Sequence, residues 1–128
     1  MRYYDTLAEY DRNGFNVVVD KTWEEIDVGD CFDDTCYDIQ DMRNKINSGQ
    51  LDWFMLRVRV FVDDIELSSE YLGGMLYDNP SECLTDGSAE DLIHSALESA
   101  KDRMHGLYQK FWALSMEIDA ERAGNPTA

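Results

Sequence analysis

Strict alternation of apolar and other residues marks one segment of the chain most clearly. In residues 53–62 every even position is apolar, whereas the odd positions are mixed. A period of two is typical of a β-strand with one face in the core. Asp63-Asp64 then predicts a two-residue turn into a second strand over residues 65–71, which makes a central β-hairpin. The positions predicted to face the core are Phe54, Leu56, Val58, Val60 and Val62.

The solvent side of this hairpin carries charges of both signs. Alternation places Arg57 and Arg59 across from Glu66 and Glu70, so we expect cross-strand ion pairs there. Gly73-Gly74 interrupts the second arm and predicts a bulge or a turn.

A helical pattern of apolar residues dominates the C-terminal third. Ser88 is predicted as the N-cap, with Asp91 completing a capping box, and the helix reaches to about Arg122. Such a helix is on the order of 50 Å long, and Gly106 is the position that most favours a bend. It overhangs the small sheet, so either it bends back or its far half pairs with a second subunit. The residues predicted for a dimer interface are Leu107, Phe111, Leu114 and Ile118.

Shorter patterns predict the remaining elements. Residues 3–10 have helical spacing that Asn13-Gly14 would end, and residues 15–19 are β-branched and predict a strand. Asp33 or Asp34 suits the N-cap of a helix that stops at Ser48-Gly49. The expected fold is a single acidic α+β domain, residues 1–128. In it a small antiparallel sheet of about three strands packs against the long C-terminal helix and one or two shorter helices.

Charge is the unusual feature of the composition. The chain has 128 residues, 44% of them hydrophobic, and carries 27 acids against 11 Lys and Arg, a net charge of -16. Nine acids and a single base, Lys21, fall between Asp20 and Asp41. This balance argues against direct binding to nucleic acid or to an anionic membrane, because both would repel it. No apolar stretch is long enough to span a bilayer, and three cysteines suit a reducing cytoplasm, so we expect a cytoplasmic protein.

Two explanations of the acidic stretch stay open. Its charge either serves solubility alone or forms a recognition surface for a cationic partner. Trp23 stands at its start, where it either anchors the stretch to the body, which we favour, or lies exposed as a contact residue. The residues predicted to bind a partner are Trp23, Glu24, Glu25, Asp27, Asp30, Asp33, Asp34, Asp38 and Asp41.

Signals for catalysis or metal binding are weak. Residues 9–14 with Asp20 mimic the oxygen spacing of a calcium-binding loop, but a strand follows where a helix should begin. Cys31, Cys36 and Cys83 lack the paired spacing of a zinc site and are interpreted as core thiols. With no nucleophile motif in the sequence, we expect a non-enzymatic protein without a metal or another cofactor.

Several short motifs between Trp53 and Lys101 resemble a group of small acidic proteins of bacteriophages and prophages. They are Arg57-Val58-Arg59-Val60, Glu66-Leu67, Tyr71-Leu72-Gly73-Gly74, Asp86-Gly87 and Glu90-Asp91-Leu92. The resemblance implies a phage accessory role in a bacterial host cell, in the neighbourhood of anti-CRISPR and DNA-mimicking anti-restriction proteins.

Together with the charge, this resemblance favours an inhibitor. Its acidic surface would mimic phosphates and bind a basic, nucleic-acid-binding host protein or complex of CRISPR-Cas or restriction defence. The alternative is a structural or regulatory phage protein that works as a homodimer through its C-terminal helix, with acidity serving solubility.

Overall fold

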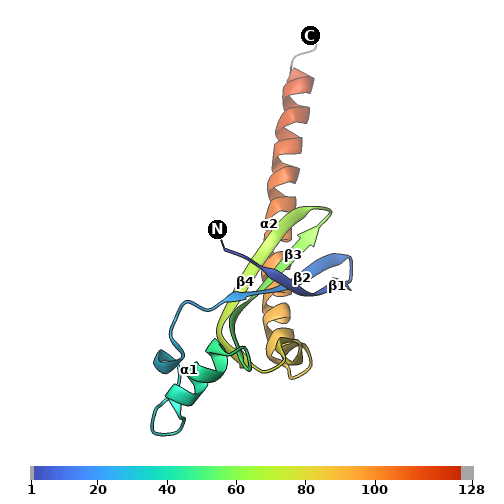
Figure 1. The fold of residues 1–128 in the computed structure, drawn as a ribbon. Helices are drawn as coiled ribbons and strands as arrows, with labels where there is room; N and C mark the ends of the chain where they lie inside the picture. Colours follow the sequence, from blue (N-terminus) through green and yellow to red (C-terminus); the bar gives the residue numbers. More distant parts are fainter. Residues whose placement is uncertain (1, 125–128) are drawn as a thin grey trace.

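Four antiparallel strands form a sheet in the order β1-β2-β3-β4, so each strand pairs with the next one along the chain (Figure 1). The computed structural model describes residues 2–124. Within them lie the strands β1 (Asp5–Arg12), β2 (Phe15–Trp23), β3 (Asp52–Val62) and β4 (Ile65–Tyr77). The helical elements are α1 (Ile39–Asn47), α2 (Ser88–Gly124) and the short 3₁₀ segments η1 (Val28–Asp30) and η2 (Pro80–Leu84). The predicted α+β class is confirmed.

Left-handed backbone closes both tight hairpins. Asn13 and Gly14 have φ of 56° and 90°, and Asp63 and Asp64 have φ of 50° and 49°. Positive φ at both central residues is the property of a type I′ turn, whose twist matches that of the flanking strands. The hairpin predicted at Asp63-Asp64 is therefore confirmed.

The N-terminal segment is a strand, and the helix predicted there is wrong. β1 pairs with β2 from Asp5, opposite Lys21, to Arg12, opposite Phe15. Asn-Gly is common both at a helix end and in a type I′ turn. Here it forms the turn, because residues 5–12 pair with the β-branched strand β2. The sheet thus has four strands where about three were predicted, and the loop with calcium-like spacing is an ordinary hairpin.

The core lies between one face of the sheet and the first half of α2. β3 turns its even positions into this core, as predicted, although Val62 at the hairpin tip is half-buried. Ser68 Oγ of β4 donates to the carbonyl oxygen of Ala96 at 2.7 Å, because small residues let α2 approach the sheet closely. The buried residues of α2 are Ala89, Ile93, Ala96 and Ala100.

A bulge at Gly73-Gly74 is confirmed, but the predicted pairs across the hairpin are wrong. Register shifts in β4 leave Arg57 opposite Tyr71 and Arg59 opposite Ser69, not opposite glutamates. The shifts turn Glu70 toward α2, where its Oε1 accepts a hydrogen bond from Ser99 at 3.0 Å. Two arginines of β3 are therefore free to pair elsewhere on the sheet.

The helix α2 is 37 residues long and runs through Gly106 without interruption, so it does not bend back over the sheet. Ser88 is its first residue and not its N-cap, because Asp86 supplies the carboxylate that accepts the Ser88 N–H at 2.9 Å. From Lys101 to Gly124 every side chain except that of Leu107 is exposed, and this half of the helix projects beyond the sheet (Figure 1). Neither described helix has an apolar stretch long enough to cross a bilayer.

Candidate functional site

Residues 24–47 form a separate lobe, which we call the acidic lobe, at the end of the molecule away from the projecting half of α2 (Figure 1). It contains η1, a loop and α1. Its bases are Arg43 and Lys45. All eight predicted partner-binding acids belong to this lobe: Glu24, Glu25, Asp27, Asp30, Asp33, Asp34, Asp38 and Asp41.

Few apolar contacts hold the acidic lobe to the sheet. Val28 of η1 is 2% exposed. The indole N–H of Trp53 donates to the carbonyl oxygen of Ile26 at 2.8 Å, and the Trp53 ring lies 6.1 Å from that of Phe32. Phe32 in turn meets Tyr37 edge-on at 5.1 Å. The anchor predicted at Trp23 is therefore supplied by Val28 and Trp53.

Trp23 itself is half exposed at the end of β2. The guanidinium of Arg2 lies 5.1 Å from the centre of its ring, a distance that suits a cation–π contact. The prediction that Trp23 anchors the acidic stretch is thus wrong. Its side chain is exposed, as the alternative interpretation expects.

Aspartate side chains cap the N-terminal ends of the helical elements of the acidic lobe. Asp27 accepts the Gly29 N–H at 3.0 Å at the start of η1, and Asp38 accepts the Asp41 N–H at 3.1 Å at the start of α1. The N-cap of α1 is therefore Asp38, not Asp33 or Asp34 as predicted. Asp33 accepts the Thr35 N–H at 2.9 Å, and this hydrogen bond lowers the pKa of its carboxyl group.

Three of the eight acids form ion pairs. Arg43 Nη2 lies 2.6 Å from Asp27 Oδ2, and this hydrogen bond lowers the pKa of Asp27. Lys45 pairs with Asp41 at 3.0 Å, and Arg2 pairs with Glu25. Exposed pairs contribute little stability, but each removes charge that a partner could meet.

Glu24 has a structural task that its sequence position does not reveal. Its Oε2 accepts the N–H of Gly74 at 3.0 Å, and Oε1 accepts the N–H of Ile26 at 3.3 Å. Glu24 thereby joins the start of the acidic lobe to the bulge of β4. Four of the eight acids of the lobe are exposed and form no ion pair within residues 2–124: Asp30, Asp33, Asp34 and Asp38.

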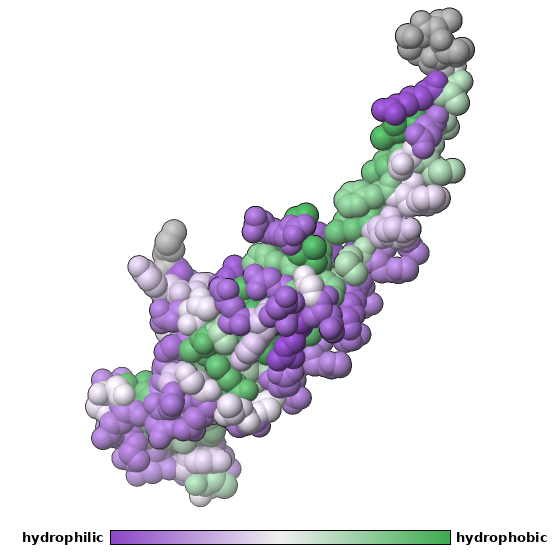
Figure 2. Space-filling view, turned by 90° about the vertical axis from the view of Figure 1, so that its right-hand side faces the viewer, coloured by the Kyte–Doolittle hydropathy of each residue, from purple (hydrophilic) through white to green (hydrophobic). Residues whose placement is uncertain are grey.

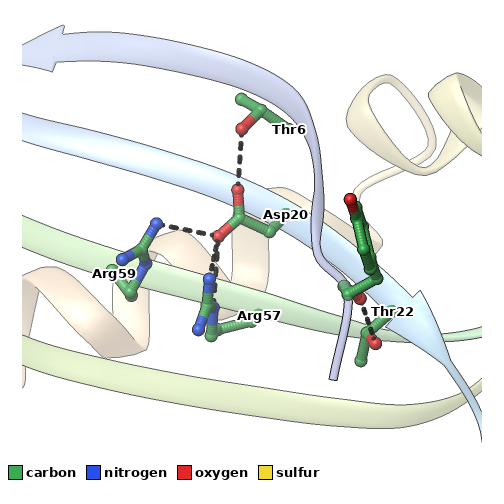
Figure 3. A network of polar contacts seen from close by, with 6 residues as sticks. Thr6, Asp20, Thr22, Arg57 and Arg59 are labelled. Carbon is green, nitrogen blue, oxygen red and sulfur yellow. Dashed lines mark hydrogen bonds and ion pairs between the residues drawn. The ribbon is translucent and has the colours of Figure 1, made fainter. Parts of the chain in front are cut away.

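Asp20, the first acid of the predicted stretch, belongs to the sheet and not to the acidic lobe. It is 1% exposed. Its Oδ2 accepts hydrogen bonds from Arg57 Nη2 at 2.6 Å and Arg59 Nη2 at 3.0 Å, and its Oδ1 accepts one from Thr6 at 3.1 Å (Figure 3). The Arg57 guanidinium also stacks on the Tyr4 ring, with 3.4 Å to its centre. Pairing brings Asp20 directly opposite Arg57 on the neighbouring strand.

The cysteines separate into two kinds. Cys83 of η2 is fully buried, and burial raises the pKa of its thiol to about 11, so its interpretation as a core thiol is confirmed. Cys31 and Cys36 are exposed in the acidic lobe, so that interpretation is wrong for them. Within residues 2–124 the structure brings no three His, Cys, Asp or Glu side chains together as a metal site.

The second predicted site follows the projecting half of α2. Leu107 is half-buried against the hairpin, whereas Phe111, Leu114 and Ile118 are 61%, 45% and 50% exposed. Trp112 is also exposed. Figure 2 shows hydrophobic residues along this helix beyond the body of the molecule. The two halves of α2 differ in the size of their side chains. The first half contacts the sheet mainly through alanines, whereas the second half carries large apolar side chains that are exposed.

Comparison of the chain with protein-family models, with curated proteins and with solved structures gives no match.

Proposed function

We propose that this protein is a non-enzymatic inhibitor that binds a nucleic-acid-binding defence complex through the acidic lobe, whose carboxylates take the place of phosphates. The observation that supports the proposal is the cluster Asp30, Asp33, Asp34 and Asp38, exposed within nine residues of a single lobe. Arg and Lys of a phosphate-binding groove form charge-assisted hydrogen bonds with carboxylates as they do with phosphates.

Local hydrogen bonds suit these carboxylates for such a role. Asp33 and Asp38 each accept a backbone N–H, which restricts how their side chains move. Less side-chain freedom is then lost on binding, so more of the electrostatic attraction is retained as affinity. The excess negative charge of the lobe also steers a basic partner toward it, and this attraction weakens with salt.

Neutralisation of the four exposed carboxylates tests the proposal. The variant Asp30→Asn, Asp33→Asn, Asp34→Asn, Asp38→Asn keeps the cap of α1, because Asn is as good an N-cap as Asp. We expect it to lose at least about tenfold in the inhibition of plasmid cleavage by a CRISPR-Cas or restriction nuclease that the wild type inhibits, since four charge-assisted contacts are lost. The inhibition by the wild type should also weaken steeply with added salt.

A matched control separates recognition from overall charge. Asp63→Asn, Asp64→Asn, Glu66→Gln and Glu82→Gln together remove the same charge from exposed positions outside the acidic lobe. This control should retain inhibition. Full inhibition by the lobe variant, equal loss in both variants, or no inhibition of either nuclease class by the wild type contradicts the proposal.

A further inference from the structure

The apolar stripe of α2 does not end where the sheet ends. Met104, Leu107, Tyr108, Phe111, Leu114 and Ile118 recur every three or four residues, which places them on one side of the helix. This side continues the one that packs Ile93, Ala96 and Ala100 against the sheet. Beyond Leu107 the large side chains of the stripe are exposed, as the green band in Figure 2 shows.

We infer that this stripe is a homodimer interface, in which the projecting halves of α2 from two copies pack against each other. The inference does not rest on the function proposed for the acidic lobe.

The exposed area is of the right size. With about 150–250 Å² for each aromatic side chain, the exposed parts of the residues of the stripe amount to roughly 600 Å² per copy. A standard protein interface buries about 800 Å² per partner. Monomers rarely expose a contiguous apolar patch above a few hundred Å² without an interaction to cover it.

The distribution of charge favours the projecting half of α2 as the surface where two copies meet. Residues 101–124 hold four bases and four acids, so this segment is neutral in a chain whose net charge is -16. Two copies of such an acidic protein repel each other wherever their other surfaces meet. Pairing through α2 keeps the two acidic lobes apart, because each lies at the far end of its own molecule (Figure 1).

An apolar groove of about 240 Å³ marks the place where the hairpin stops covering the stripe. It lies between Val62, Ile65 and Leu67 of the hairpin and Met104, Leu107, Tyr108 and Phe111 of α2. A second copy can therefore cover the stripe from this groove toward the C-terminal end of α2.

Light scattering and sedimentation of the full chain over a range of concentrations test the dimer itself. The wild type should dimerise, and Phe111→Ser with Leu114→Ser should remain monomeric at every concentration at which the wild type is a dimer. Neither residue belongs to the hydrophobic core, so the body folds without them. Met116→Ser, on the opposite side of the helix from the stripe, is the control and should dimerise as the wild type does. A monomeric wild type overturns the inference and assigns the stripe to a partner of another kind.

Discussion

Asp20 and Asp30 have the same side chain in the same acidic stretch, yet the fold uses them in opposite ways. Asp20 lies in β2, where neighbouring β3 places two arginines within hydrogen-bond distance and the site excludes water. Asp30 ends η1 and stays exposed. A buried carboxylate needs cations and donors to offset its desolvation, whereas an exposed one keeps its charge available to a partner.

Removal of the Asp20 carboxylate should destabilise the protein strongly. Asp20→Ala leaves Arg57 and Arg59, 14% and 29% exposed, without their shared partner. We expect a loss of about 3–5 kcal/mol in the free energy of unfolding, measured by urea denaturation. Lys45→Ala removes an exposed pair with Asp41 and should cost less than about 1 kcal/mol. Similar losses in the two variants would show that the Asp20 network does not hold the sheet together.

At the scale of elements, local pattern and observed structure agree best where one face of an element is buried. The alternation in β3 was sufficient to predict its core face, and helical spacing was sufficient to predict α2. The pattern of residues 3–10 was misleading, because both period-two and helical spacing fit it and the partner strand decided. Arg57 and Arg59 were placed on the correct strand, but bulges in β4 changed what lies opposite them.

Gly106 tests whether α2 is an uninterrupted helix in solution. A Cβ at Gly106 meets no other atom within 4 Å, so Gly106→Ala should raise the helical content by circular dichroism and stabilise α2 by about 1 kcal/mol. Gly87 has equally open space but a φ of 96°, so Gly87→Ala should lower the melting temperature. A stabilising Gly87→Ala or a destabilising Gly106→Ala would contradict the backbone described here.

At the scale of the whole molecule, the first strand and the last helix are joined by a charged contact. Arg12 of β1 donates two hydrogen bonds to Glu90 of α2, at 2.7 and 3.1 Å, across 78 residues of chain. These bonds lower the pKa of Glu90 below its usual 4.5. The pair therefore stabilises the folded state above about pH 4.5 and loses this contribution as the pH falls through the lowered pKa.

Unfolding of wild type and Glu90→Gln at two pH values measures this contribution. At pH 7 we expect the wild type to be more stable by less than about 1 kcal/mol, since water reaches both side chains, which are 34% and 53% exposed. At pH 3 the difference should shrink, because below about pH 4.5 the unfolded wild type takes up a proton at Glu90, whose pKa is lowered only in the folded state. A difference that stays constant with pH would assign the effect to the shape of the side chain and not to its charge.

Periodicity and charge along the chain were enough to establish the α+β class, the central hairpin, the long helix and an acidic segment with few cations. These are properties that neighbouring residues encode together, through the side-chain periods of strand and helix. Three features required distant segments to meet: the fourth strand, the burial of Asp20 by Arg57 and Arg59, and the anchoring of the acidic lobe by Trp53. Each depends on which surfaces face one another after folding, and no local pattern contains that information.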